Sequence, residues 1–292
     1  MIPLISAAII EILSFKGSHM ISSTHTPNVR WLPNYIKAFG PLAGLSMMWR
    51  VASLDRAGRD TPAPIIVPEL GEIWLRAALH DHSIFQQVWV KREYDLALAA
   101  PGHFPALRQR YQATLERGGK PLILDAGAHI GVSVLWWRHL FPEAWIVAIE
   151  PSLANLAVLK RNVAQLKDVI VLHAALSAEA GSLKIANKVA GGSAVRVKAE
   201  GTGEDVPAIT VAQVLEQAEA EEILLAKIDI EGGEAALFAA NLAWLDQTHA
   251  LVVETHDWLY PGEGTSRSLF AAIAARHFDF LTHGENILLF RC

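Results

Sequence analysis

Short apolar runs alternate with longer segments of helical periodicity from residue 121 to the end of the chain. The apolar runs predict buried strands at 121–127, 145–150, 169–176, 223–230 and 249–256. The segments between and after them predict helices at 131–141, 152–166, 209–220, 233–242 and 265–277. Runs this uniformly apolar are typical of parallel strands that helices cover on both faces. The pattern therefore predicts an α/β fold built on a parallel sheet.

Two further pairs of segments belong to this half of the chain. Residues 182–187 and 194–199 resemble an inserted hairpin or an extension of the sheet edge, and residues 278–283 and 286–291 predict a terminal hairpin. Ser152 precedes the second helix and is predicted as its N-cap, because a serine hydroxyl accepts a bond from a free amide of the first turn.

The leading region, residues 31–120, has a mixed α/β pattern. Apolar positions predict a helix at 43–54, and the turn Glu69-Leu70-Gly71 predicts a hairpin over 65–77. A short helix is predicted at 83–90, with Asp81 as its cap, and a longer one at 104–117 that ends at paired glycines. We expect three parts: an extension (1–30), an N-terminal cap (31–120) and a main domain (121–292).

Composition narrows the class of protein. The chain has 292 residues, is 52% hydrophobic and carries a formal net charge of −5, which argues against a nucleic-acid partner. Its only cysteine, Cys292, excludes an intrachain disulfide and any cysteine-rich zinc site, and favours a reducing, cytoplasmic setting. Mean hydropathy is +0.26, so membrane association has to be considered.

The candidate membrane segment is residues 1–15. It is shorter than the roughly 20 apolar residues of a spanning helix, and Glu11 interrupts it, so we expect no membrane association. A peripheral anchor and a loosely packed extension both fit its pattern. Gly17-Ser18-His19-Met20 resembles the remnant of a cleaved tag, which would make the preceding residues non-native.

The turn Asp125–Gly131, between the first strand and its helix, is the strongest local motif. Gly127 and Gly131 let the backbone bend sharply and bring amides against a ligand. Their spacing, G-x-x-x-G, is not the dinucleotide pattern G-x-G-x-x-G. The carboxylate of Asp125 would repel a pyrophosphate but accept a bond from an ammonium group. This favours a ligand with an amino-acid moiety, such as S-adenosylmethionine; a purely structural turn is the alternative.

A second carboxylate, Glu150, ends the second strand. Ligands of open parallel sheets bind beyond the carboxyl ends of the strands, and a carboxylate there can accept both hydroxyl protons of a ribose. Glu150 therefore predicts a nucleoside ligand without identifying it. An ordinary surface carboxylate is the alternative, and the neighbouring glycine turn argues against it.

Acidic residues also follow the fourth strand. Alternation places Lys227, Asp229 and Glu231 on one side of the chain, where a carboxylate can orient a hydroxyl, remove its proton or help to bind a divalent cation. We predict catalytic roles for Asp229 and Glu231. Glu234 is more simply explained by the first turn of a helix, where the helix dipole favours acids.

His256, at the end of the fifth strand, is the third candidate catalytic residue. Its position beside acids suits a general base or a metal ligand next to Asp229 or Glu231. No ligand spacing in the sequence supports a metal site, so none is assigned and a divalent metal is left open. His129 is the other histidine of interest, because its place in the glycine turn puts it near the ligand.

Together these motifs resemble the FkbM family of S-adenosylmethionine-dependent methyltransferases. The matching segments are LILDAGAHIGVSVLWW (122–137), IVAIEPSLANLAVLKRNV (146–163), HAALS (173–177), AKIDIEGGE (226–234) and VVETHDWLYPG (252–262), with the lead-in DHSIFQQVWVKREYD (81–95). The order of D-x-G-x-x-x-G, I-E-P and K-I-D-I-E-G-x-E is more specific than any one piece. His129 is a departure, since the family often has asparagine there.

The resemblance implies a Rossmann-like, seven-stranded, mostly parallel sheet whose last strand is antiparallel. It also implies O-methylation of a small-molecule hydroxyl in a sugar, polyketide or other secondary metabolite. By the same resemblance, the cofactor residues are Asp125, Gly127, Ala128, His129, Gly131, Glu150, Pro151, Ala175, Ser177 and Asp229. The turn from His173 to Ser177 would approach the adenine, and Asp229 and Glu231 would face the acceptor.

The expected mechanism is in-line methyl transfer, in which the protein aligns the acceptor and removes its proton. His256 or Asp229 is the expected base, with Glu231 in a positioning role. A nicotinamide-dependent oxidoreductase and a non-catalytic partner that binds S-adenosylmethionine or a glycan are the alternatives. The acceptor and the oligomeric state are left open, a homo-oligomer included.

Overall fold

The computed structural model describes residues 29–57, 61–68, 70–77, 81–185, 197–198 and 203–292. Residues 1–28 of the extension lie outside these residues, and with them the apolar segment 1–15 and the tag-like Gly17–Met20. Most of the predicted strand 194–199 also lies outside them. In the part of the chain that the structure describes, no helix is long and apolar enough to cross a membrane.

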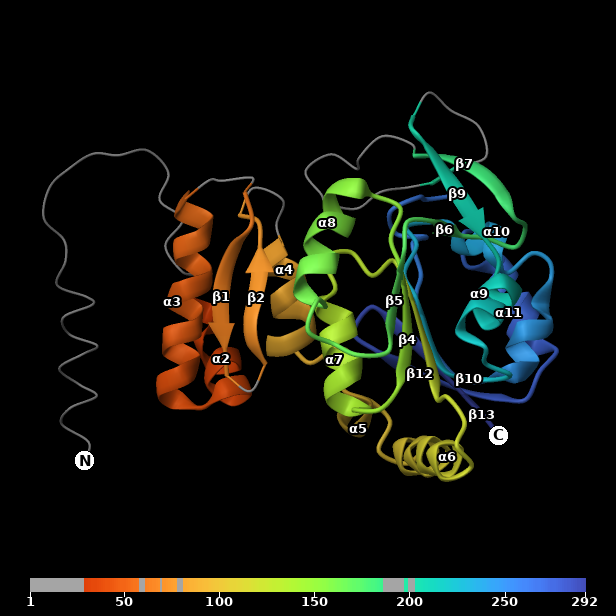
Figure 1. The fold of residues 1–292 in the computed structure, drawn as a ribbon, viewed down its shortest axis with the longest axis horizontal. Coiled ribbons are helices and arrows are strands. Elements are labelled where there is room, and N and C mark those ends of the chain that lie inside the picture. The colour runs from red at the N-terminus through yellow and green to blue at the C-terminus, as the bar shows by residue number, and fades with distance from the viewer. Residues whose placement is uncertain (1–28, 58–60, 69, 78–80, 186–196, 199–202) are drawn as a thin grey trace, which may run out of the picture.

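A seven-stranded sheet with the order β12-β13-β11-β10-β3-β4-β5 forms the centre of the molecule (Figure 1). Its strands are β3 (Leu122–Ala126), β4 (Trp145–Ile149), β5 (Val169–Leu172), β10 (Ile223–Ile228), β11 (Thr248–Glu254), β12 (Phe278–His283) and β13 (Asn286–Arg291). β13 pairs antiparallel with both of its neighbours, whereas β11, β10, β3, β4 and β5 pair in parallel. The predicted mostly parallel, Rossmann-like sheet with an antiparallel last strand is confirmed.

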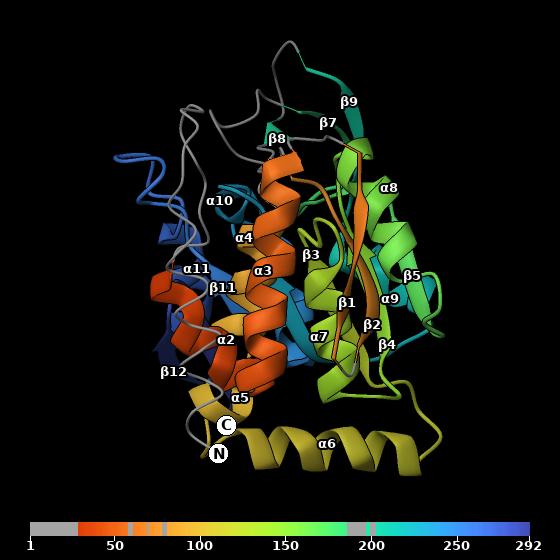
Figure 2. The same cartoon turned by 90° about the vertical axis from the view of Figure 1, so that its left-hand side faces the viewer.

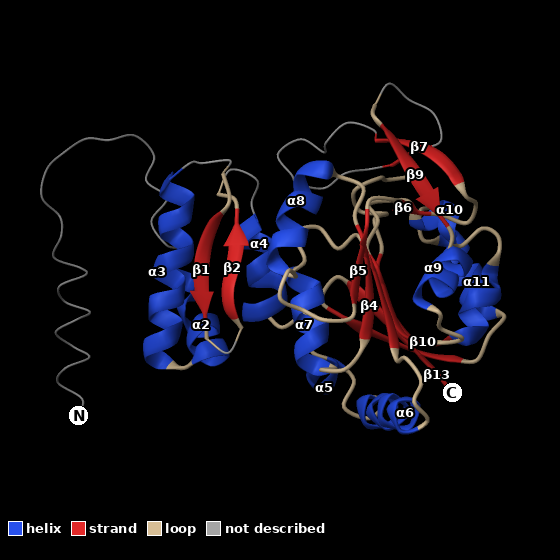
Figure 3. Ribbon diagram, in the orientation of Figure 1, coloured by secondary structure: helices blue, strands red, loops and turns tan. Residues whose placement is uncertain are grey.

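Helices cover both faces of this sheet (Figure 3). α7 (Val132–Leu140) and α8 (Leu153–Asn162) lie on one face, and α9 (Val211–Ala218), α10 (Glu234–Leu237) and α11 (Arg267–Ala274) lie on the other. Successive residues of a strand enter opposite cores: Ile123 packs with the first group and Leu124 with the second. Both residues are fully buried, which explains why the strands are apolar throughout.

Local signals fix the starts of two of these helices. The Ser152 hydroxyl accepts a bond from the Asn155 amide and caps α8, as predicted. Thr210 and Gln213 form a reciprocal capping box at the start of α9.

The leading region packs against the α7–α8 side (Figure 2). It contains a 3₁₀ turn (Val29–Trp31), α2 (Leu32–Phe39), α3 (Pro41–Ala57), β1 (Ala63–Val67), β2 (Gly71–Leu75), α4 (Asp81–Phe85), a π-helical turn (Gln86–Val90), α5 (Leu96–Ala99) and α6 (Phe104–Glu116). The β1–β2 hairpin lies between α3 and α8, and the Asn162 side chain bonds to the backbone of Trp74 in β2. The hairpin and its α8 neighbours share one buried core.

Several predicted elements differ from the structure. The run 169–176 divides: β5 ends at Leu172, and β6 (Ala175–Leu176) joins a separate sheet with the order β6-β9-β7-β8. In that sheet β7 (Gly181–Ile185) pairs with β8 (Val197–Lys198), as predicted, but mainly with β9 (Asp205–Ile209), which the pattern missed. The predicted helix 233–242 is only α10, followed by a 3₁₀ turn at Leu242–Gln247. Asp81 is the first residue of α4, and its carboxylate accepts hydrogen bonds from the Arg76 guanidinium. It is therefore not the predicted side-chain cap.

Candidate active site

A cavity of about 970 Å³ lies at the carboxyl ends of β3, β4 and β10. Its walls combine the loops after these strands with the β6–β7 segment and with Ser83, Gln87 and Tyr94 of the leading region. Among the predicted residues, its lining includes Gly127, Ala128, His129, Glu150, Pro151, Ala175, Ser177, Asp229 and Glu231. The structure thus brings most of the predicted cofactor residues and two predicted catalytic residues to one cavity.

Gly127 allows two loops to touch at the base of this cavity. Its φ is +76°, and a Cβ atom there would lie 1.8 Å from the Asp229 carbonyl oxygen. Its amide and that of Ala128 both donate to the Ile149 carbonyl at 3.0 Å. The prediction that the turn presents free amides therefore needs correction at these two positions. What Gly127 provides is a close backbone approach.

Gly131 lies outside the cavity lining and has a packing role. It is the N-cap of α7 with φ of +85°, and a Cβ atom there would meet the Leu159 side chain of α8 at 2.5 Å. The second glycine of the motif thus lets α7 and α8 approach one another.

Glu150 is buried and held by three hydrogen bonds. Oε2 accepts from the His129 amide at 2.9 Å, and Oε1 accepts from the Ser152 amide at 2.9 Å and the Asn155 side chain at 3.1 Å. Burial raises the pKa of its carboxyl group, and these bonds counter that rise. A carboxylate has about four acceptor sites, so Oε2 retains capacity for a ligand hydroxyl.

Asn155 is itself positioned by the leading region. Arg76 donates to the Asn155 side-chain oxygen at 2.8 Å and to the Ala154 carbonyl at 3.0 Å. Its guanidinium also makes two bonds to the buried Asp81 carboxylate, at 2.9 and 3.0 Å. A continuous chain of hydrogen bonds therefore runs from Asp81 through Arg76 and Asn155 to Glu150.

His129 presents a neutral imidazole at the cavity. Its φ is +49°, in the left-handed region, and within the described residues both of its buried ring nitrogens lack a hydrogen-bond partner. Burial, followed by the charges of Arg76 and Lys227, lowers the pKa of His129 to about 3. A neutral ring offers one donor and one acceptor to a ligand.

Asp125 and Lys227 form a buried charged pair behind the glycine turn. The Lys227 ammonium lies 3.6 Å from Asp125, 3.2 Å from Asp229, and donates to the Gly127 carbonyl at 2.7 Å. Burial would lower the pKa of Lys227, but the surrounding negative charges, Asp229 first, raise it. Lys227 thus supplies the ammonium group that Asp125 was predicted to receive from a ligand.

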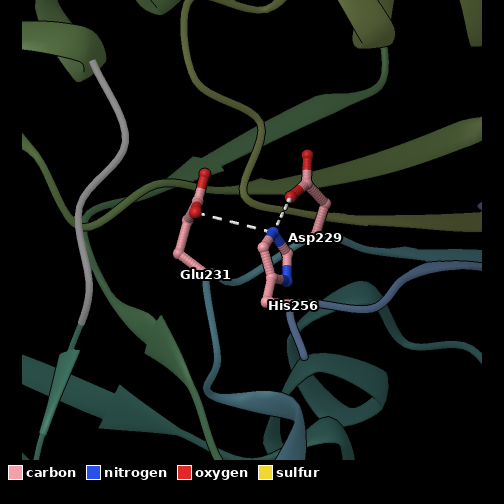
Figure 4. Close-up of side chains that lie close together, drawn as sticks. All are labelled: Asp229, Glu231 and His256. Atoms are coloured by element: carbon pink, nitrogen blue, oxygen red, sulfur yellow. Dashed lines mark ion pairs between the residues drawn. The ribbon is translucent and has the colours of Figure 1, made fainter. Parts of the chain in front are cut away.

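Asp229 and Glu231 line another wall of the cavity, and the buried His256 lies in contact with both (Figure 4). Both carboxylates approach the same imidazole nitrogen: His256 Nε2 lies 3.6 Å from Asp229 Oδ1 and 3.5 Å from Glu231 Oε2. Glu254 Oε1 lies 3.8 Å from that nitrogen. His256 is only 1% exposed, whereas Asp229 and Glu231 are 23% and 24% exposed at the side chain. The predicted catalytic residues thus meet at the ends of β10 and β11.

Glu234 orients the His256 ring from the side of its other nitrogen, Nδ1. Its Oε1 accepts from the Ile230 amide at 3.1 Å and lies 3.0 Å from His256 Nδ1. Glu234 is fully buried at the first position of α10. A favourable place in the first helical turn therefore describes only part of its role, because it also fixes the imidazole ring.

Crowding of the carboxylates shifts their titration. Burial and then Asp229 raise the pKa of Glu231 to about 7 and that of Glu254 to about 8. Burial lowers the pKa of His256, but the bond to Glu234 and the surrounding carboxylates outweigh it and raise the value to about 9. Glu231 has a φ of +55°, a left-handed conformation that bulky residues rarely adopt. Strain and shifted titration at one place indicate a functional site.

Sequence reasoning missed four residues of the site or assigned them no role. Tyr94 reaches the cavity from the leading region, Asn155 and Glu234 position other groups, and Lys227 joins Asp125 to Asp229. For Lys227 and Glu234, the K-I-D-I-E-G-x-E motif carried a signal. For Tyr94 no local pattern does.

Comparison with known families matches this arrangement of motifs. The sequence model of the methyltransferase FkbM domain family matches residues 125–282, more than half of the chain. The chain belongs to the FkbM methyltransferase family. The match begins in β3 and ends in β12, so it includes the glycine turn, Glu150 and the Asp229–Glu231–His256 group.

Individual relatives of this FkbM-family chain are distant or cover little of it. Methyltransferase sdnD of Sordaria araneosa is 41% identical over 68 residues, which are 22% of this chain and 26% of that protein. The crystal structure of methyltransferase FkbM from Methylobacillus flagellatus KT is 11% identical, over 90% of this chain and 58% of that one, with a TM-score of 0.42. A fibrillarin pre-rRNA processing protein of Methanococcus jannaschii is 10% identical over 58% of this chain and 65% of that one, with a TM-score of 0.35. The chain thus spans about a quarter of the curated relative.

Proposed function

We propose that the protein is an S-adenosylmethionine-dependent O-methyltransferase whose acceptor is a small-molecule hydroxyl, of a sugar, polyketide or similar metabolite. One observation carries the proposal. The same cavity has a nucleoside-type carboxylate, Glu150, on one wall and the acid pair Asp229 and Glu231 on another. A methyltransferase needs both: a site for the cofactor and a group that receives the acceptor's proton.

The residues present fit S-adenosylmethionine. The backbone at Gly127 leaves no room for a side chain, Glu150 retains acceptor capacity, and His129 has unsatisfied ring nitrogens. In the proposed arrangement the Gly127 turn holds the methionine part, Glu150 the ribose, and the Ala175–Ser177 segment the adenine. Bound there, the cofactor supplies an electrophilic sulfonium methyl group.

Glu231 is the better candidate for the base, with Asp229 beside it. A pKa of about 7 suits a group that must accept a proton near neutral pH. His256, with a pKa of about 9, carries a proton at neutral pH and so cannot readily accept another. This refines the expectation from the sequence: His256 positions the two carboxylates, and Glu231 or Asp229 receives the hydroxyl proton.

The leading region is proposed as the acceptor-side cap of the main domain, residues 121–292. Tyr94, Gln87 and Ser83 line the cavity together with the methyltransferase residues. Tyr94 is buried, and the lysine and acids around its hydroxyl include Lys227, Asp229 and Glu254. Substitution of Tyr94, Gln87 or Ser83 should therefore change acceptor specificity.

Calorimetry of the full chain with S-adenosylmethionine, S-adenosylhomocysteine and NADH tests the cofactor. Saturable binding of the first two and none of NADH is expected; the reverse would favour the oxidoreductase alternative. Acceptor panels of sugars, polyketides and lipids, read by the mass gain of one methyl group, test the reaction. Cofactor binding without S-adenosylhomocysteine production on any acceptor would favour the non-catalytic alternative.

A further inference from the structure

The contacts of His256 Nε2 are too long for direct hydrogen bonds. Three carboxylate oxygens lie 3.5, 3.6 and 3.8 Å from it, whereas N–H···O bonds are about 2.7–3.2 Å. Atoms that share a metal ion at about 2.1 Å, with near-tetrahedral angles, lie about 3.4 Å apart. The ligand atoms of Asp229, Glu231 and His256 all lie within 4.8 Å of one another. The distances from His256 Nε2 to Asp229 Oδ1 and to Glu231 Oε2 are those of atoms around a shared ion.

Neighbouring groups orient two of these three ligands, His256 and Asp229. Glu234 lies 3.0 Å from His256 Nδ1, so the ring's other nitrogen faces the carboxylates. The Lys227 ammonium lies 3.2 Å from Asp229 Oδ2, which leaves Oδ1 facing Nε2. Metal-binding histidines ordinarily donate their second ring nitrogen to a carboxylate in this way. Glu234 and Lys227 therefore hold two of the ligands in place from behind.

Negative charge in this part of the site exceeds positive charge. The cations are the Lys227 ammonium and, when protonated, the His256 imidazole. The carboxylates in contact with one or both are Asp125, Asp229, Glu231, Glu234 and Glu254. With all five ionised, a surplus of three negative charges remains, in a region where most of these groups are buried. Such a surplus is costly unless protons or a cation offset it.

We propose that Asp229, Glu231 and His256 bind one divalent transition-metal ion, Mn²⁺ or Zn²⁺, at the acceptor side of the cavity. An imidazole nitrogen among the ligands favours Zn²⁺ over Mg²⁺ and Ca²⁺, and the two carboxylates also suit Mn²⁺. The ion would take the place of the proton on His256 Nε2. Three protein ligands leave coordination positions for water or an acceptor oxygen. Metal binding itself does not depend on the proposed function. The role of the ion does rest on it: the ion would hold the acceptor hydroxyl beside the methyl donor.

The test uses the full chain after treatment with a chelator. Mn²⁺ alone is titrated in, and free Mn²⁺ is measured by electron paramagnetic resonance. One saturable site per chain is expected. Asp229→Asn and Glu231→Gln should each weaken it at least about tenfold, and Glu234→Gln, which keeps the ligands but loosens the ring, by about 10- to 100-fold. Glu116→Gln makes the same charge change at an exposed position of α6, outside the cavity lining, and should leave the affinity within about twofold.

Circular dichroism of each variant checks that it is folded. Absence of saturable Mn²⁺ and Zn²⁺ binding at millimolar metal would overturn the proposal, as would equal affinity in the wild type, Asp229→Asn and Glu231→Gln. Calorimetry with S-adenosylhomocysteine in the presence of chelator separates this from the proposed function. Cofactor binding and methyl transfer that persist in chelator would support the proposed function and contradict a role of the metal in the reaction. Metal binding without cofactor binding would support the metal site and contradict the proposed function.

Discussion

Glu150 and Glu231 follow β4 and β10, the two strands on either side of β3, yet the groups around the two carboxylates differ. Glu150 is 3% exposed, and three donors hold it in place. Glu231 lies in a left-handed turn among other carboxylates, with its pKa raised to about 7 by burial and Asp229. Hydrogen-bond donors hold Glu150 before any ligand arrives, whereas the carboxylates around Glu231 outnumber the cations beside them. The first arrangement is suited to binding, and the second to chemistry.

The largest expected effect of a single change is on turnover, at Asp229. Asp229→Asn keeps the shape of the side chain but removes its charge from the acceptor side, so we expect turnover to fall by about 10²- to 10⁴-fold. Affinity for S-adenosylhomocysteine, measured by calorimetry, should change little. Asp279→Asn, at an exposed aspartate paired with His103, is the matched control. Unchanged turnover in Asp229→Asn would refute the assignment.

Gly127→Ala should destabilise the contact between the loops that follow β3 and β10. The added methyl group would lie 1.8 Å from the Asp229 carbonyl oxygen at a φ of +76°, so the two loops must separate. We expect a loss of about 3 kcal/mol in the free energy of unfolding, measured with urea. Gly102→Ala, where a Cβ atom meets nothing within 4 Å, should stay within about 0.5 kcal/mol of the wild type. Similar losses in both variants would contradict the proposed close approach.

Glu150→Gln should weaken the cofactor rather than the chemical step. The change removes a charged acceptor and turns an amide nitrogen toward the donors of His129, Ser152 or Asn155. Affinity for S-adenosylhomocysteine should drop by about 10- to 100-fold, the value of one or two charged hydrogen bonds. Calorimetry measures it, with Glu143→Gln at an exposed position as control. Normal affinity would mean that the ribose binds elsewhere.

His129→Asn should change the pH dependence of stability. The folded-state pKa of His129 is about 3, against 6.5 for the ordinary residue. Below pH 6.5 the unfolded chain therefore takes up a proton that the folded chain does not, and stability falls as pH falls. At pH 5 the loss is about 2 kcal/mol, some 30-fold in the folding equilibrium.

Urea unfolding at pH 7 and pH 5 measures this difference. His129→Asn should lose about 2 kcal/mol less than the wild type between these values, while His277→Asn, at an exposed histidine, should behave like the wild type. Asparagine also tolerates the left-handed conformation at this position. An identical pH dependence in all three proteins would show that the His129 ring is hydrated.

Periodicity predicted the central sheet because its middle strands, such as β3 and β10, are buried on both faces and therefore form continuous apolar runs. It could not locate the break within 169–176, where the run stays apolar although the chain leaves the sheet. There, the His173 ring contacts the Pro151 carbonyl at 3.0 Å. β9 was missed because its middle residue is Pro207, a residue that normally argues against a strand.

The site was predictable where neighbouring strands end. Asp229 and His256 follow β10 and β11, which pair in parallel, so their meeting follows from the order of the strands. Glu234 was missed because its place in a helix gave a sufficient local explanation. Tyr94 could not be placed, because only tertiary packing brings the leading region to the cavity.

The hydrogen bonds of Arg76 have a consequence for anyone who wishes to exchange acceptor specificity between relatives. The sequence pattern changes at residue 120, which invites a hybrid protein joined at that point. Yet Arg76 lies before the junction, and the Asn155 side chain that it fixes lies after it. A hybrid whose leading region lacks the Arg76–Asp81 pair is expected to inherit a loosened Glu150 and with it a poorer cofactor site. A hybrid protein should therefore retain Arg76 and Asp81, because these two residues of the leading region position a side chain beyond the junction.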